Sequence, residues 1–458
     1  MRKKALLAAL MAMILLTSGC ALIVRDEAVD AATPVIRMGD QVITKAEVKA
    51  QVESELYQQA SWYQMFGQSF DYTDPANIAA AQESAIEALK KDMVLNAKAK
   101  ELGFDQLTAE DEASIKENAQ KDLDSIISQA KNYVENAEGM SEEELTEAAT
   151  KQAEESGYTL DAYVNYEKGN LISKRLKDYA IQDVAVTDEE IQAEYESKVA
   201  ANKETYAEKP GSWATAANNG TTLYYTPAGV RRVKQILTKF KDEDQAAIDE
   251  ANKQLTEANT ALSTAQAKVD SAQSAVDTEG ITDEDKAAAE ETLNAAKQEL
   301  DEADKALLAA NEAVTAATDK AFANLDEEVD AILASLDAEG ADWQAIMDEK
   351  NQDPGMKSNE KGYAVAADMT GFDSAFVEAA MALEKPGDHS GKVKGTSYGY
   401  YIIRYEGDEA EGPVDLETVK EGISSTLLKN KQDDTYDAAV AEWVEAAGIK
   451  VDLNALKD

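Results

Sequence analysis

The middle of the chain carries a seven-residue repeat of large apolar residues, most followed three positions later by alanine. The first run comprises Ile248, Leu255, Leu262, Val269 and Val276, and the second comprises Leu293, Leu300, Leu307 and Val314. Residues 278–283 (TEGITD) separate the runs, with Gly280 as a helix stop and Thr282 as the next helix cap. These heptad seams predict an antiparallel coiled-coil hairpin, a rod of roughly 50 Å whose second arm continues to Leu336. The unbroken register disfavours the alternative, a disordered acidic tract.

Helical spacing also dominates residues 34–207, before the rod. Residues 35–44 predict a β-hairpin, because two short apolar runs flank Gly39-Asp40. Residues 208–229, rich in Gly, Asn, Thr and Pro, predict a loop or linker, and residues 409–458 predict a C-terminal helix that packs back on the first region. Helices are predicted near residues 45–66, 75–103, 108–137, 141–156, 159–181 and 187–207. Thr44, with Glu47 three residues later, forms a capping box that predicts the start of the first of these helices.

The first residues have the pattern of an export signal. Three basic residues (2–4) precede an apolar run (5–16) and then Thr-Ser-Gly-Cys. Small residues directly before a cysteine resemble the bacterial lipobox, so we expect a signal peptide over 1–19, lipidation of Cys20 and a flexible tether over 20–33. The resemblance implies a lipid anchor on the extracytoplasmic face of the cell membrane. An ordinary secretory signal with an incidental cysteine is the alternative.

Composition narrows the chemistry that is open to the chain. The 458 residues have a net charge of -44, which disfavours nucleic acid as a partner because phosphates are repelled. Cys20 is the only cysteine and His389 the only histidine, so an internal disulfide and a histidine cluster are excluded. His389 lies in a Gly-Asp-His-Ser segment and is expected to be solvated. No metal or cofactor is predicted.

Residues on both sides of the rod resemble a parvulin-type peptidyl-prolyl isomerase domain. KGTSYGYYIIRY (394–405) and FVEAAMALEKPG (376–387) resemble its last strand and helix, and VRRVKQILTKF (230–240) its first strand. The domain would span 230–408, with the rod inserted at 241–338. Residues 34–207 resemble the chaperone region of exported foldases related to PrsA and SurA. The resemblance implies an α+β fold, with mostly helical chaperone segments at both ends and a small antiparallel sheet with helices between them.

The resemblance also implies a site. The barrier to rotation about a peptide bond is ~18–20 kcal/mol, and a catalyst needs an apolar pocket for the proline ring and polar groups that favour the twisted amide. Phe372, Phe376 and Tyr398 match pocket positions, although the two phenylalanines could simply be core residues.

The polar floor departs from the parvulin pattern. Its two signature histidines map to Gln235 and Tyr401, neither of which titrates near neutral pH as histidine does. Asp353 falls near an acidic position of the family. Gln235 and Tyr401 could be structural replacements only, and Asp353 could only start a turn.

These patterns together predict a membrane-anchored foldase that binds unfolded or newly translocated exported proteins, with isomerase activity weakened or lost. One alternative is a catalytically inactive holdase. The other is a surface structural protein that uses the rod as a spacer or as the contact of a homodimer.

Overall fold

The computed structural model describes residues 27–135 and 137–457. The predicted signal peptide (1–19) and Cys20 lie outside the described residues. The chain divides into two compact units, one running to Val186 and including Thr426–Asp458, the other spanning Thr187–Ser425. Within the described ranges, no helix combines the length and the apolar character needed to cross a membrane.

The first unit combines a small sheet with helices. β1 (Pro34–Met38) lies between β2 (Gln41–Thr44) and β9 (Lys450–Val451) in an antiparallel sheet. Val35 and Ile36 are buried there against α3 (Lys45–Met65) and α4 (Pro75–Glu101). A capping box between Thr44 and Glu47 starts α3, as the sequence predicts. The chain's last strand therefore lies beside its first described strand.

The rest of this unit is helical. It contains α5 (Ala109–Ala130), α6 (Glu142–Glu155), α7 (Leu160–Ile181) and the end of α15 (Leu416–Ala446). Arg175 on α7 donates to both carboxylate oxygens of Asp111 on α5 at 2.8 Å. Lys177 pairs with Asp433 of α15 at 2.5 Å. Charged hydrogen bonds thus connect these helices at partly exposed positions.

The expectation of a flexible tether over residues 20–33 is wrong for its described part. Glu27–Ala31 form helix α2, which packs beside α3. The buried Lys45 pairs with Asp30 of α2 at 3.0 Å. A buried ammonium group requires a partner, and this ion pair holds the segment to α3.

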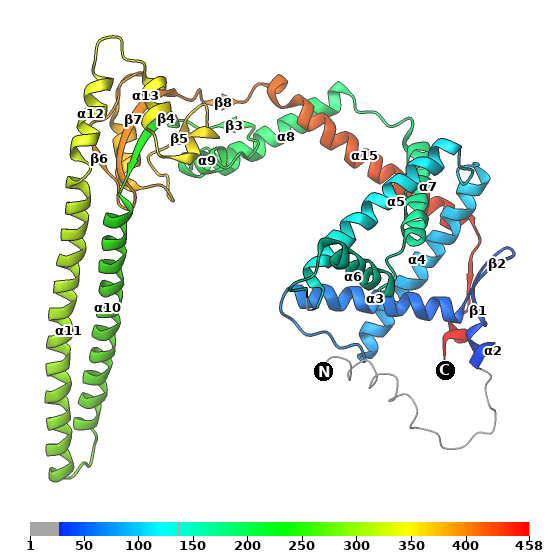
Figure 1. Cartoon of the computed structure of the whole chain (residues 1–458), viewed down its shortest axis with the longest axis horizontal. Helices are drawn as coiled ribbons and strands as arrows, with labels where there is room; N and C mark the ends of the chain where they lie inside the picture. Colours follow the sequence, from blue (N-terminus) through cyan, green and yellow to red (C-terminus); the bar gives the residue numbers. More distant parts are fainter. Residues whose placement is uncertain (1–26, 136, 458) are drawn as a thin grey trace. The chain divides into compact units, whose positions relative to one another are not determined.

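The second unit is built on a four-stranded antiparallel sheet in the order β5-β4-β7-β6 (Figure 1). The strands are β5 (Tyr363–Val365), β4 (Arg231–Lys239), β7 (Gly399–Asp408) and β6 (Val393–Lys394). Ile236 of β4 lies opposite Ile402 of β7. The segments before and after the rod therefore form one sheet, and the predicted α+β fold class is confirmed.

Alternation along β4 and β7 gives the sheet two different apolar faces. Leu237, Tyr401 and Ile403 pack with α9 (Pro210–Asn218) and α14 (Ser374–Ala382) on one face. Ile236, Tyr400 and Ile402 pack on the other face with Phe322 and the helices α12 (Asp326–Leu336) and α13 (Trp343–Lys350). The base of the rod therefore packs on one face of the sheet, whereas Tyr401, a predicted site residue, lies on the opposite face of the same two strands.

The predicted linker over 208–229 is also wrong in its secondary structure. It contains α9 and β3 (Tyr225–Thr226), which pairs with β8 (Gly412–Pro413). Trp213 is buried, and its indole nitrogen donates to the Tyr225 carbonyl at 2.6 Å. Pro210 at the first helical position suits a helix start, and burial of Trp213 outweighs the loop-like composition.

Helix α8 (Asp188–Tyr206), predicted to belong to the first helical region, lies in the second unit. The Tyr195 hydroxyl donates to the Val414 carbonyl at 2.6 Å, and Asn202 accepts from the Tyr224 amide at 2.8 Å. These long-range hydrogen bonds decide the unit in which α8 packs.

The rod consists of α10 (Asp242–Val276) and α11 (Asp283–Ala323), which lie side by side and antiparallel (Figure 1). The seam alanines are buried, as the heptad pattern requires. They are Ala251, Ala258, Ala265, Ala272, Ala296, Ala303 and Ala310.

The second arm does not continue unbroken to Leu336. The helix stops after Ala323 and restarts as α12, because the side chain of Asn324 donates to Asp244 and Leu325 is buried under the sheet.

Candidate functional site

All six cavity residues predicted from sequence line one cavity of about 370 Å³. This volume lies within the range of small-ligand sites. Each element adjoining the cavity contributes side chains: β4, the turn after α13, β5, α14 with its leading loop, and β7 with the loop before it. The predicted residues are Gln235, Asp353, Phe372, Phe376, Tyr398 and Tyr401.

A row of aromatic rings forms the apolar wall. Ring centroids are 5.3 Å apart for Tyr363 and Phe372, 5.7 Å for Phe372 and Phe376, and 5.4 Å for Phe376 and Tyr401. Phe376 and Tyr401 are also buried in the core of the unit, whereas Tyr398 is 58% exposed at the rim. The phenylalanines therefore serve both as core residues and as cavity wall.

Asp353 is the hub of the polar floor. Its Oδ2 accepts hydrogen bonds from Nε2 of Gln235 at 2.7 Å and from the Tyr363 hydroxyl at 2.9 Å. Its Oδ1 accepts from the backbone amide of Gly355 at 2.9 Å and caps a short 3₁₀ helix, Pro354–Lys357. Oδ1 thus starts a turn, which is the purely structural role that the sequence left open for Asp353, while Oδ2 holds Gln235 and Tyr363 in place in the cavity.

Gln235 lines the cavity, and only one polar atom of its side chain has a hydrogen-bond partner among the described residues. Its Nε2 is committed to Asp353, because a carboxylate can only accept there. Its Oε1 is buried and has no hydrogen-bond partner among the described residues. A buried carbonyl oxygen without a donor is unfavourable, and a donor supplied by a ligand would remove that cost.

The hydroxyls of Tyr401 and Tyr363 remain protonated at physiological pH. Burial, and then the nearby charge of Asp373, raises the pKa of Tyr401. Burial, and then the hydrogen bond to Asp353, raises the pKa of Tyr363. Both groups therefore present O–H donors rather than phenolates.

Gly395 makes room for the ring of Tyr401. A Cβ at Gly395 would lie 2.5 Å from Cε2 of Tyr401, closer than such atoms approach. The backbone amide of Gly395 donates to the Gly399 carbonyl at 2.8 Å and fixes the turn. Any side chain at residue 395 would therefore displace the ring of Tyr401, which lines the cavity.

Tyr363 and Asp373 also line the cavity but were not predicted from the sequence. Asp373 caps α14 by accepting from the Ala375 amide at 3.0 Å, and it also accepts from the Thr396 amide at 2.5 Å. An Asp-Ser pair before an apolar helix is an N-cap signal that could have identified it. Tyr363 lies on a strand of three residues, which is too short to give a periodic signal.

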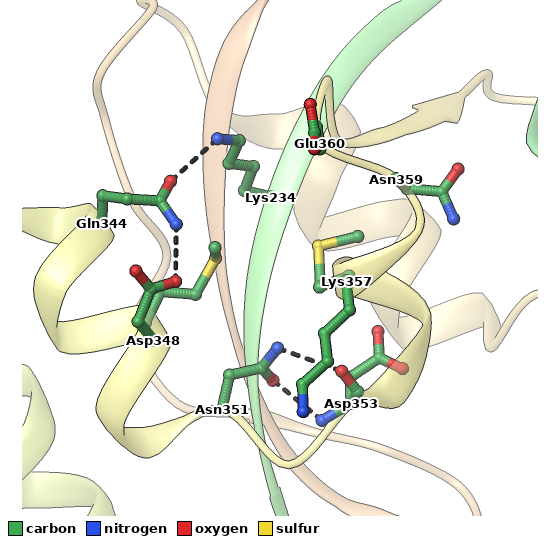
Figure 2. A pocket seen from close by; sticks show the side chains of 10 residues that line it. Lys234, Gln344, Asp348, Asn351, Asp353, Lys357, Asn359 and Glu360 are labelled. Carbon is green, nitrogen blue, oxygen red and sulfur yellow. Dashed lines mark hydrogen bonds between the residues drawn. The ribbon is translucent and has the colours of Figure 1, made fainter.

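A second cavity of about 450 Å³ shares Asp353 with the first (Figure 2). Three of its polar side chains are joined by hydrogen bonds: Lys234 donates to Gln344 at 3.0 Å, and Gln344 donates to Asp348 at 2.7 Å. It lacks the aromatic wall of the first cavity. The cavity beside Phe376 is therefore the candidate site.

His389 lies outside both cavities. It was expected to be solvated, but its side chain is partly buried. Its ring lies 6.0 Å from that of Trp343, and its Nε2 approaches Asp337 at 3.4 Å. In the described ranges no three His, Cys, Asp or Glu residues are grouped to hold a metal ion.

Comparison with known proteins finds sequence similarity to foldase proteins named PrsA. No family model matches it. A foldase protein PrsA of Clostridium botulinum is 32% identical over 128 residues, covering 27% of this chain and 37% of that protein. A foldase protein PrsA of Clostridium perfringens is 25% identical over 253 residues, covering 54% of this chain and 60% of that protein. The chain is PrsA-like.

The matches of the PrsA-like chain span less than two thirds of these relatives' length. Among solved structures, it is similar at 14% identity and a TM-score of 0.20 to foldase protein PrsA of Streptococcus pneumoniae, covering 93% of this chain and 97% of that one. It is similar at 14% identity and a TM-score of 0.25 to a chain from a study of the SurA-like chaperones PEB4 and Cj1289 of Campylobacter jejuni, covering 92% and 100%. The relationship to PrsA therefore rests on the sequence matches.

Proposed function

We propose that the PrsA-like chain is an extracytoplasmic foldase, which binds unfolded, newly translocated polypeptides and assists their folding. Two observations support the proposal: the sequence matches to foldase proteins, and the aromatic cavity that Gln235, Phe376 and Tyr401 line. Of these, the cavity is the observation that carries the proposal. Cys20, preceded by the export-signal pattern, would anchor the chain to the membrane through lipid.

The cavity suits a prolyl residue. Phe372, Phe376 and Tyr401 offer ring faces to the pyrrolidine and exclude water from the peptide bond. The amide must lose its resonance to rotate, and an apolar wall that holds the ring leaves the preceding carbonyl free to turn. No covalent step and no cofactor are required.

The polar groups would act on the twisted amide. The neutral hydroxyl of Tyr401 can donate to the prolyl nitrogen, whose lone pair becomes available as resonance is lost. The free Oε1 of Gln235 can accept an N–H from the client backbone beside the proline. Asp353 acts indirectly, because its hydrogen bond fixes the orientation of the Gln235 amide.

A second function, a holdase without isomerase activity, is favoured by one observation. The pKa of Tyr401 is raised, so its hydroxyl stays protonated at neutral pH, where the histidine that the resemblance maps to this position would titrate. The cavity would then only dock proline-containing segments.

A proline-peptide isomerisation assay, run beside suppression of aggregation of an unfolded client, separates these functions. Uncatalysed isomerisation takes tens to hundreds of seconds, so weak catalysis is measurable. We expect the wild-type chain to exceed the buffer rate, Phe372→Ala to lose about tenfold in kcat/KM, and the exposed-site control Tyr133→Ala to match wild type.

A wild-type rate equal to buffer, with aggregation still suppressed, would leave only the holdase. The double variant Gln235→His, Tyr401→His would then show whether the aromatic wall still supports isomerisation when histidines are restored. Loss of both activities in the wild-type chain would refute the foldase proposal.

A further inference from the structure

Five aromatic side chains form an exposed patch at the end of α3 and in the loop after it. We name it the aromatic patch; its members are Trp62, Tyr63, Phe66, Phe70 and Tyr72. Ring centroids are 4.8 Å apart for Trp62 and Phe66, and 5.4 Å for Tyr63 and Phe70. Trp62 is 57% exposed, Phe66 60% and Tyr72 50%. The rings thus contact one another while a large part of their surface meets solvent.

The chain provides no cover for the aromatic patch in its described part. Helix α3 buries Val48, Val52 and Ala60, but every residue from 61 to 69 is exposed. Met65 adds a further flexible apolar side chain that is 78% exposed. Contiguous exposed apolar surface of this kind marks an interaction site, because leaving it in water is unfavourable.

The charged residues of the sequence interval that carries the aromatic patch all have one sign. No lysine or arginine lies between Lys49 and Lys90. Glu55 lies seven and eleven positions before Trp62 and Phe66, so all three share a helix face. Its carboxylate accepts from Ser84 of α4 at 3.1 Å, which places α4 beside this face. The acidic residues of this interval are Glu53, Glu55, Asp71, Asp74, Glu83 and Glu87.

One of these carboxylates adjoins the rings directly. Asp71 lies between Phe70 and Tyr72, and it accepts from the amide and hydroxyl of Thr73 at 2.8 and 2.7 Å. These hydrogen bonds lower the pKa of Asp71, so its negative charge persists beside the patch.

We propose that the aromatic patch binds extended, unfolded polypeptide segments in which apolar residues are flanked by lysine or arginine. The rings would cover the apolar residues, and the surrounding carboxylates would attract the basic flanks. The inference rests on the proposed function and assigns the client surface to the first unit, whereas the proline cavity belongs to the second unit. An anionic membrane and a second copy of this acidic chain carry the same sign of charge as the patch surroundings, so both are disfavoured.

Binding of short labelled peptides, followed by fluorescence anisotropy on the full chain, tests the proposal. Two peptides share an unstructured apolar core, flanked by lysines in one and by glutamates in the other. The variant is Trp62→Ser with Phe66→Ser, and the matched control is Tyr133→Ser with Tyr166→Ser, which alters two tyrosines of the same unit that are 75% and 60% exposed.

We expect the lysine-flanked peptide to bind wild type about tenfold more tightly than its glutamate-flanked partner, and the difference to shrink at about 1 M salt, where the Debye length is only about 3 Å. The patch variant should lose about tenfold in affinity and in aggregation suppression, with its isomerisation rate unchanged. The control should behave as wild type.

Equal affinity for the two peptides, or unaltered binding by the patch variant, would overturn the inference. So would patch-dependent sedimentation with phosphatidylglycerol vesicles in the absence of peptide binding, or a dimer that the patch variant abolishes. If wild type suppresses aggregation and the patch variant does so equally well, only this inference fails. If wild type neither suppresses aggregation nor accelerates isomerisation, the proposed function fails.

Discussion

Replacing Asp353 with alanine tests whether one carboxylate organises the cavity. The side chain accepts from Gln235, Tyr363 and the Gly355 amide at 2.7, 2.9 and 2.9 Å. In Asp353→Ala the Gln235 amide, in a residue only 6% exposed, loses its partner, and its other polar atom already has none. The Tyr363 hydroxyl, inside the same cavity, also loses its acceptor.

The magnitude follows from these lost hydrogen bonds. A buried donor left without a partner costs about 1–3 kcal/mol, whereas the half-buried Gly355 amide can turn to water. The buried Gln235 donor therefore gives an expected destabilisation of the second unit of about 1–3 kcal/mol, and the half-buried Tyr363 hydroxyl adds a smaller cost. The pKa of Tyr363 should fall at the same time, because the hydrogen bond and the charge that help to raise it are removed.

Denaturant unfolding followed by tryptophan fluorescence measures this change. In a Trp62→Phe, Trp443→Phe background only Trp213 and Trp343 remain, and both are buried in the second unit. The control is Asp348→Ala, which removes a carboxylate that accepts only from Gln344 within the second cavity. Equal unfolding free energies for the two variants would refute the role of Asp353, as would an unchanged absorbance titration of Tyr363.

Three further predictions concern packing and charge. Gly395→Ala should destabilise the second unit by about 1–3 kcal/mol, and less in a Tyr401→Ala background, where only the 2.9 Å approach of the new Cβ to the Gly399 carbonyl remains; a double-mutant cycle of unfolding free energies measures the difference, and equal costs in both backgrounds would contradict the contact with Tyr401. Phe322→Ala should lower the unfolding free energy by about 3–5 kcal/mol, because the centroid of its ring lies 4.9 Å from that of Phe240 and 4.8 Å from that of Tyr400. The control Leu308→Ala, at a 65% exposed site on the same helix, should lower it by less than about 0.5 kcal/mol. The hydrogen bond from the Thr108 amide, and then the hydrogen bond from Arg175, lowers the pKa of Asp111 from 3.8 to about 2. The ionised carboxylate therefore stabilises the first unit above pH 3.8, and this stabilisation is lost as the pH falls toward 2. The melting temperature should fall less steeply across this range in Asp111→Asn than in wild type, and an equal slope would count against this role of Asp111.

Local patterns in the sequence were sufficient for several parts of the fold. The heptad repeat predicted the rod and its buried alanines, because helix packing repeats with the period of the helix itself. The resemblance of VRRVKQILTKF and KGTSYGYYIIRY to parvulin strands predicted strands β4 and β7. The capping box at Thr44 predicted the start of α3 from two side chains three residues apart. Each signal lies within a few residues of the feature that it predicts.

The tertiary structure decided what depends on distant partners. The sequence around Trp213 has the composition of a loop, yet burial of that ring makes it helical. The second arm has continuous helical periodicity, yet Asn324 ends it through hydrogen bonds to Asp244, eighty residues earlier. No pattern in the sequence predicted that Tyr363 lines the cavity, because its position is fixed by the pairing of its strand with β4. Periodicity records which face of a segment is buried, whereas the partner on that face is set by contacts far along the chain, and those contacts appear only in the folded molecule.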